Sequence, residues 1–258
     1  MKNDYEPILI ETPKPFNEIE VYAIHDLHMG NELFDNGAWE RMKAEILEQP
    51  NRYVVFVGDA MENAVIGSKG DVYNQTVPPH LQQEWFTEQL IELKDRVLAI
   101  VDGNHERNRS TKNCDLYPLY TSAAIAGMQD KYRPHFAVCD IGVGCRDKDK
   151  KQQVHYVLYL VHRAKTGRGA NTALATSGID VVICGHDHEP KDFPRAQLHY
   201  NPINKNITTR SIEVVDAGSW LNYGGYSVDG GYLPNSSKKY KLVLHGGEKK
   251  IETVGFYI

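Results

Sequence analysis

The chain has 258 residues, 41% of them hydrophobic and 24% charged, a composition that is ordinary for a globular protein and excludes global disorder. No apolar run approaches the roughly 20 residues that span a bilayer, and residues 1–15 carry charges and prolines where a secretory signal needs an apolar core. The net charge of −5 gives no overall basic surface for nucleic acid. None of the four cysteines has zinc-knuckle spacing, so we expect free thiols in a reduced, cytoplasmic protein. Because no apolar run is long enough to span a bilayer, we expect no membrane association.

Short apolar runs alternate with helix-like stretches, which is typical of an α/β fold. In chain order, we predict strands at residues 20–24, 53–57, 97–101, 154–161 and 179–184. A helix is predicted around Trp39, Met42 and Ile46, with Asp35 or Asn36 as its cap, and further helices at 81–96 and 120–128. Residues 61–80 are expected to form a long loop.

Beyond residue 190 the pattern changes to short strands and glycine-rich turns. Strands are predicted at 214–217, 241–244 and 251–257, and we expect them to form a second sheet packed on the first. The chain has no internal repeat and no obvious linker, which predicts a single domain over residues 1–258.

Polar residues follow each of the first five predicted strands. Ligands bind at the carboxyl edge of an open α/β sheet, so we expect these segments to converge on one place. They supply oxygen and nitrogen donors that borderline divalent metals prefer, namely Asp26, His28, Asp59, Asn104, His162, His186 and His188. Seven donors are too many for one ion, whereas two ions that share a carboxylate would use them all. Two ions about 3.5–4 Å apart are a standard arrangement for attack on phosphorus.

The ordered motifs have a specific resemblance. They are Asp26-x-His28, Gly58-Asp59, Gly103-Asn104-His105-Glu106, His162 and Gly185-His186-x-His188. This set resembles the five motifs of the calcineurin-like metallophosphoesterase superfamily, over residues 26–188. The resemblance implies a four-layer α/β/β/α sandwich of two mixed sheets flanked by helices, with a dinuclear metal site at the carboxyl ends of strands.

The resemblance also implies a role for each motif residue. One metal ion would be held by Asp26, His28 and His188. The other would be held by Asn104, His162 and His186, with Asp59 as the bridge between the two. A metal-bridging hydroxide would attack phosphorus, and His105 would bind phosphate and protonate the leaving oxygen. Glu62 stands where many members carry the acid that orients this histidine, and a solvated loop carboxylate is the alternative.

Two positions depart from the common pattern of the family. His25 stands where a small residue often precedes the first motif, which leaves open an exchange of ligand roles between His25 and His28. Arg163 follows His162 where glycine is frequent, so the pocket is expected to be narrower or more positively charged.

A basic rim is predicted around the site. The segments after the third and fourth motifs carry six cations opposed only by Glu106, namely Arg107, Arg109, Lys112, Arg163, Lys165 and Arg168. Arginine suits bidentate phosphate contact, so Arg107, Arg109 and Arg163 are candidate phosphate-binding residues, with ordinary charged loops as the alternative. Tyr223, Tyr226 and Tyr232 lie among glycines and are expected to form a mobile loop rather than a stacking surface.

Together these observations favour a metal-dependent phosphodiesterase acting on nucleotides or nucleic acid. A phosphomonoesterase or protein phosphatase is the enzymatic alternative. A non-catalytic metal-binding scaffold is less favoured because no motif residue is missing, and a single structural metal is less favoured because seven converging donors exceed a closed four-ligand site. The expected cofactors are two divalent ions, Mn²⁺ in vitro, with Fe²⁺, Zn²⁺ and Ni²⁺ also compatible. The expected partner is a phosphate-ester substrate, and the oligomeric state is left open.

Overall fold

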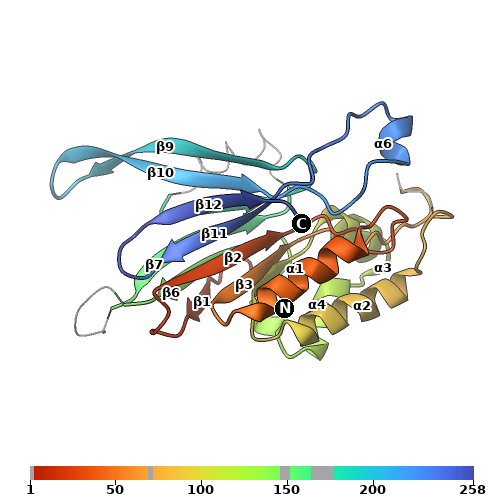
Figure 1. The fold of residues 1–258 in the computed structure, drawn as a ribbon, viewed down its shortest axis with the longest axis horizontal. Helices are drawn as coiled ribbons and strands as arrows, with labels where there is room; N and C mark the ends of the chain where they lie inside the picture. Colours follow the sequence, from red (N-terminus) through yellow and green to blue (C-terminus); the bar gives the residue numbers. More distant parts are fainter. Residues whose placement is uncertain (1–2, 69–71, 146–151, 164–176) are drawn as a thin grey trace.

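Two mixed β-sheets packed face to face form the centre of the computed structural model, which describes residues 3–68, 72–145, 152–163 and 177–258 (Figure 1). Sheet I has the order β12 (Ile251–Phe256), β11 (Lys239–His245), β2 (Glu18–Ile24), β3 (Arg52–Val57), β4 (Val97–Val101) and β5 (Tyr132–Arg133). Sheet II has the order β1 (Ile8–Glu11), β6 (Phe136–Val143), β7 (Val154–Val161), β8 (Val181–Cys184), β10 (Asn206–Asp216) and β9 (Lys191–Asn201).

Helices flank these sheets. The longer ones are α1 (Asn36–Glu48), α2 (Pro79–Glu92) and α4 (Pro118–Ile125). Short helical segments are the π-helix η1 (His105–Thr111), α3 (Lys112–Cys114), the 3₁₀ turn η2 (Gln129–Lys131) and α6 (Tyr226–Asp229). No helix in the described part of the chain is long and apolar enough to cross a membrane.

The side chains of β2 explain how sheet I lies between two layers. Ile19, Val21 and Ala23 alternate with Tyr22 and Ile24 along the strand, so the two sets point to opposite faces. The first set packs in the core shared with sheet II, and the second packs in the core shared with α1, α2 and α4. Both faces are therefore covered, which accounts for the apolar run at residues 21–24 of the strand.

The helix α1 forms as its periodicity predicts. Trp39, Met42 and Ile46 are buried on one face, toward sheet I. The carboxylate of Asp35 accepts the backbone N–H of Ala38 at 2.8 Å and caps the start of the helix. The two mixed sheets flanked by helices confirm the predicted fold class.

The division of strands between the sheets differs from the prediction. The segments after residue 190 do not make a separate second sheet, because β10 joins β7 and β8 in sheet II whereas β11 and β12 join β2 in sheet I. The five strands that carry the motifs are likewise split, three in sheet I and two in sheet II. Nδ1 of His162, after β7, contacts the carbonyl oxygen of Val57, in β3, at 2.8 Å. The carboxyl ends of both sets of strands therefore meet at one edge of the sandwich.

Candidate metal centre

The turns that carry the predicted ligands have an uncommon backbone conformation. Five of the predicted ligands have positive φ, namely Asp26 (52°), His28 (52°), Asp59 (48°), His186 (80°) and His188 (58°). Non-glycine residues rarely adopt this region, and such strain gathers at functional sites. The neighbouring glycines allow the turns to approach closely, because a Cβ on Gly103 would lie 2.0 Å from Oδ1 of Asp59. On Gly185, a Cβ would lie 2.9 Å from Oδ2 of Asp26.

A first donor group consists of Asp26, His28 and His188. The Nε2 atoms of the two histidines lie 3.0 Å apart. Oδ1 of Asp26 lies 3.5 Å from Nε2 of His28 and 3.3 Å from Nε2 of His188. This oxygen is buried and accepts no hydrogen bond from the described residues. A buried, unsatisfied carboxylate oxygen beside two convergent ring nitrogens fits a divalent cation.

A second donor group consists of Asp59, His162 and His186. Nε2 of His162 lies 3.1 Å from Oδ2 of Asp59 and 3.2 Å from Oδ1 of Asn104. Its Nδ1 faces the carbonyl of Val57, which places the proton on Nδ1 and leaves Nε2 free as a ligand atom. A third group joins Asp59 to His28 and His105, so Asp59 lies between the two candidate ion positions.

The charges within the two groups favour cations. Burial opposes ionisation of Asp26, but the nearby His188 and His162 hold the pKa of its carboxyl well below the usual range. Burial lowers the pKa of His28, but the nearby carboxylates of Asp26 and Glu62 raise it overall, to about 10. Burial likewise lowers the pKa of His162, and the charges of Asp59 and Asp26 raise it overall, to about 9. Without metal, protons on these histidines compensate the buried carboxylates, and a bound divalent ion would displace them.

His105 lies beside the donor groups in a fixed orientation. Its Nδ1 donates to the backbone carbonyl of Glu62 at 2.8 Å, which leaves Nε2 3.7 Å from Oδ2 of Asp59. The Glu62 carboxylate is farther from Nδ1 of His105, at 3.9 Å, and lies closer to His28 and Arg109, at 3.3 and 3.0 Å. The backbone carbonyl of Glu62 therefore orients His105, whereas the carboxylate of Glu62 connects His28 with Arg109.

The candidate phosphate-binding arginines have different surroundings. Arg109 is engaged with Glu62, through the carboxylate and also the carbonyl oxygen. Arg107 is half-buried, and its Nε donates to the carbonyl of Gly103 at 3.2 Å. Arg163 is exposed directly after His162. The other predicted rim cations after His162, Lys165 and Arg168, lie outside the described residues.

Glu106 has a role that the sequence did not predict. Its fully buried carboxylate accepts three backbone N–H groups, from Asp59 (3.0 Å), Gly103 (2.8 Å) and Met61 (3.2 Å). It thereby joins the turn after β3 to the turn after β4. Its place directly after His105 in the third motif was the signal available in the sequence.

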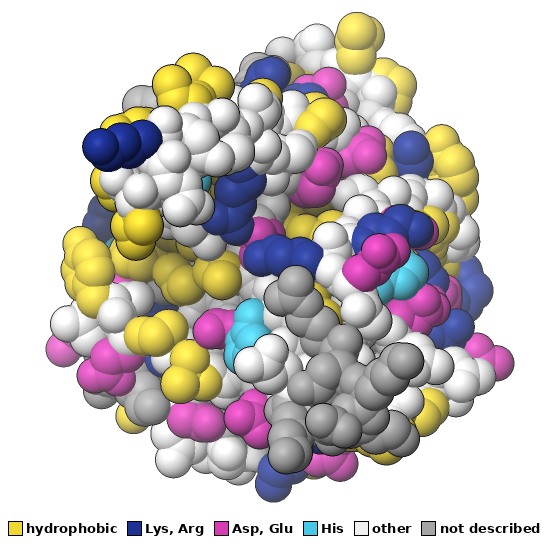
Figure 2. Space-filling view, turned by 90° about the vertical axis from the view of Figure 1, so that its left-hand side faces the viewer, with side chains coloured by type: hydrophobic (Ala, Val, Ile, Leu, Met, Phe, Trp, Pro, Cys, Tyr) yellow, Lys and Arg dark blue, Asp and Glu magenta, His cyan; other side chains and the backbone are white. Residues whose placement is uncertain are grey.

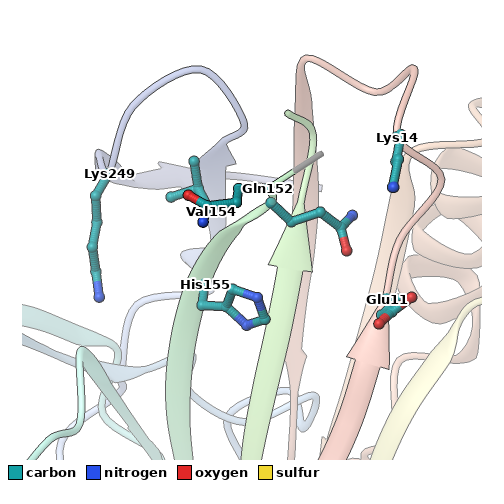
Figure 3. A pocket seen from close by; sticks show the side chains of 7 residues that line it. Glu11, Lys14, Gln152, Val154, His155 and Lys249 are labelled. Atoms are coloured by element: carbon teal, nitrogen blue, oxygen red, sulfur yellow. The ribbon is translucent and has the colours of Figure 1, made fainter. Parts of the chain in front are cut away.

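A separate pocket of about 550 Å³ lies at the start of β7, at the end of the sandwich opposite the donor groups (Figure 3). Its lining consists of Glu11, Lys14, Gln152, Gln153, Val154, His155 and Lys249. His155 contacts Asp140 at 2.8 Å, and Lys249 pairs with Asp180 at 2.9 Å. Cationic and anionic side chains are interspersed over this face (Figure 2). None of the donor groups found in the described residues lies here.

The paired donor groups fit two divalent metal ions, and a family comparison identifies the class of protein. A model of the calcineurin-like phosphoesterase family matches residues 20–190, more than half of the chain. The chain therefore belongs to the calcineurin-like phosphoesterase family and is a metal-dependent phosphoester hydrolase. A comparison with curated protein sequences gives no significant match.

Solved structures offer more distant likenesses. The chain is 15% identical to the calcineurin-like phosphoesterase YfkN from Bacillus subtilis, covering 94% of this chain and 90% of that one, with a TM-score of 0.48. The chain is 10% identical to a metallophosphoesterase from Sphaerobacter thermophilus, covering 92% of this chain and 88% of that one, with a TM-score of 0.41. It is also 10% identical to Vps29 from Chaetomium thermophilum, covering 92% of this chain and 95% of that one, with a TM-score of 0.40. At these values the assignment rests on the family match and not on structural likeness.

Proposed function

We propose that the protein is a phosphodiesterase acting on nucleotide or nucleic-acid substrates at two divalent metal ions. The observation that carries the proposal is the pair of donor groups connected through Asp59, with Nε2 of His105 beside them. Asp26, His28 and His188 would hold one ion, Asn104, His162 and His186 would hold the other, and Asp59 would be a ligand of both. When bound, the ions supply Lewis acidity toward phosphate oxygens and lower the pKa of water.

His105 is proposed to act as the general acid. Its Nδ1 proton is held by the carbonyl of Glu62, so a second proton, on Nε2, is the one available to the leaving oxygen. Burial lowers the pKa of His105 to about 4 in the free protein. A phosphate anion beside Nε2 raises this pKa, because a neighbouring negative charge favours the imidazolium form. His105 is therefore expected to gain its proton together with the substrate.

Support for a nucleotide substrate comes from the segment between β10 and β11, residues 217–238. The side-chain amide of Asn235 donates to the carbonyl of His188 at 3.0 Å, which places this segment beside the first donor group. The Tyr223 hydroxyl donates to the carbonyl of Tyr232 at 2.7 Å, and both side chains are about half exposed. Exposed aromatic rings on this segment would offer surfaces on which bases stack, at about 1–3 kcal/mol per base.

Three further points belong to the same proposal. Mn²⁺ is proposed as the ion that supports activity in vitro, since the nitrogen and oxygen donor set accepts it. The cytoplasmic location is supported by the four cysteines, all of which are free thiols. A single domain over residues 1–258 is supported by the sheets, because β12 pairs within the sheet that contains β2 and β10 within the sheet that contains β1.

The experiment is a turnover assay on metal-stripped protein reloaded with Mn²⁺. An aryl phosphodiester is compared with the matching monoester, and then with nucleotide diesters. His105→Ala is assayed in parallel as the control for contaminating phosphatase, and it should retain both ions while losing a factor of about 10²–10⁴ in rate.

Preference for the diester, with the loss in His105→Ala, is the expected result. Preference for the monoester would replace the proposal with a phosphatase. Two bound ions without turnover of either substrate class would favour the metal-binding scaffold instead.

A further inference from the structure

His25 lies fully buried between the first donor group and the end of β10. Its Nδ1 lies 2.7 Å from Oδ2 of Asp26, and its Nε2 accepts the backbone N–H of Ala217 at 2.7 Å. The ring therefore connects Asp26, a predicted metal ligand, with Ala217, the residue that directly follows β10 in sheet II. His25 is not in the first donor group, which contains His28, so the structure favours His28 over His25 as the candidate ligand.

The hydrogen bonds assign the tautomer of His25. A backbone N–H is always a donor, so Nε2, which receives the N–H of Ala217, carries no proton. The proton is therefore on Nδ1 and is donated to Asp26. Oδ1 of Asp216 is farther from Nε2, at 3.4 Å, and accepts the N–H of Gly218. The imidazole is thus neutral and held at both of its nitrogens.

This arrangement gives the two oxygens of Asp26 different roles. Oδ2 receives two donors, Nδ1–H of His25 and the backbone N–H of His186 at 2.8 Å. Oδ1 receives no hydrogen bond from the described residues and faces the ring nitrogens of His28 and His188. With Oδ2 saturated, rotation of the carboxylate would break two buried hydrogen bonds.

The residues after β10 reinforce the same contact. The backbone N–H of Trp220 and the hydroxyl of Ser219 both donate to the carbonyl of Asp26, at 3.1 and 3.2 Å. Asp26 itself has a φ of 52°, a conformation that needs support from its surroundings. The end of β10 therefore holds the backbone of Asp26 directly and its side chain through His25.

We infer that His25 is a positioning residue that fixes the carboxylate of Asp26 so that Oδ1 is presented to a metal ion. The inference rests on the proposed dinuclear centre and adds a residue that is not itself a ligand. Hydrogen-bond partners behind metal ligands typically contribute about 10- to 100-fold in metal affinity.

Two substitutions separate the contacts of His25. In His25→Asn the side-chain amide replaces Nδ1–H and can still donate to Asp26, but the acceptor for Ala217 is lost. In His25→Gln the amide extends to the position of Nε2, so Ala217 keeps an acceptor and Asp26 loses its donor. Each variant removes one buried hydrogen bond, so a purely structural role predicts similar losses in both.

The measurement is calorimetric titration of metal-stripped wild type and both variants with Mn²⁺. We expect His25→Gln to weaken one of the two binding steps by about 10- to 100-fold and His25→Asn to stay within a few-fold of wild type. Binding in His25→Gln as tight as in wild type, or equal weakening in both variants, would overturn the inference and leave the proposed function intact. A wild type that binds no ion would overturn both.

A second measurement needs no variant. The ¹⁵N shifts of the His25 ring in the wild-type protein report which nitrogen is protonated. The inference predicts the Nδ1–H tautomer, and an Nε2–H tautomer would overturn it.

Discussion

Replacement of Glu106 tests how the turns that carry the metal ligands are held together. Its carboxylate accepts three buried N–H groups, two on Oε2 and one on Oε1. Leaving a buried donor without a partner costs about 1–3 kcal/mol, so Glu106→Ala is expected to lower the free energy of unfolding by about 3–9 kcal/mol. That is a large part of the about 5–15 kcal/mol typical of a folded domain.

Glu106→Gln is the milder variant. The glutamine amide has one acceptor oxygen, and its nitrogen is a donor. The oxygen can accept either the two N–H groups now on Oε2 or the single N–H now on Oε1, but not all three. We expect a loss of about 1–3 kcal/mol per orphaned N–H. Burial and the nearby Asp59 raise the pKa of Glu106, so part of this loss is offset when the buried charge is removed.

The assay is urea unfolding of the metal-free protein at neutral pH, with metal content measured on separate samples. Glu84→Gln, at an exposed position of α2, is the matched control and should change the stability by less than about 0.5 kcal/mol. The expected order of stability is wild type, then Glu106→Gln, then Glu106→Ala, with metal content falling in the same order. If Glu106→Ala unfolded at the same urea concentration as wild type, the three N–H contacts would not have the role assigned to them.

Three further predictions concern the site and its surroundings. Asp59→Asn should lower the affinity for both ions, since Asp59 lies between the donor groups, and normal metal content and activity by elemental analysis and turnover would exclude a bridging role. Arg163→Glu should raise KM for phosphate-rich substrates, whereas the control Lys205→Glu, in the distant turn between β9 and β10, should leave KM unchanged. An equal change of KM in both variants would exclude Arg163 from substrate binding. Burial lowers the pKa of Lys239 to about 8 from the usual 10.5, so between these pH values the unfolded chain binds a proton that the folded chain has released. The free energy of unfolding of wild type, relative to Lys239→Met, should therefore rise by up to about 3 kcal/mol as the pH increases across this window. Urea unfolding of both proteins at several pH values measures the difference. If their free energies of unfolding changed in parallel with pH, the lowered pKa of Lys239 would be contradicted.

The sequence predicted the motif-bearing strands because each contains a run of mainly apolar residues, which is buried throughout in β4 and β8. The strand predicted at 97–101 is β4 without change, and the one at 154–161 is β7. The strand at 179–184 begins two residues later, at Val181. Local patterns were sufficient here, since an apolar run and the turn after it are encoded by neighbouring residues.

Strand pairing was less accessible from the sequence. The edge strand β9 reads KDFPRAQLHYN and is largely exposed, so it has no apolar pattern to predict it. β6 was also missed, although Ala137, Cys139, Ile141 and Val143 alternate along it and were the available signal. Which sheet each strand joins depends on partners far away in the sequence, as β11 shows by pairing with β2.

The site residues were identifiable by type, but their interactions were not. The roles of His25 and Glu106 depend on which atoms they contact, and the engagement of Arg109 with Glu62 depends on the course of the π-helix η1. These contacts follow from tertiary structure, and the positive φ values of the ligand turns have no sequence signature apart from the adjacent glycines.

Whether the seven donors hold two ions with Asp59 between them is decided by a crystal structure of Mn²⁺-reloaded protein with anomalous diffraction at the manganese edge. We expect two anomalous peaks about 3.5–4 Å apart. One should lie among Asp26, His28 and His188, and the other among Asn104, His162 and His186. A single peak, or peaks away from these side chains, would contradict the dinuclear centre.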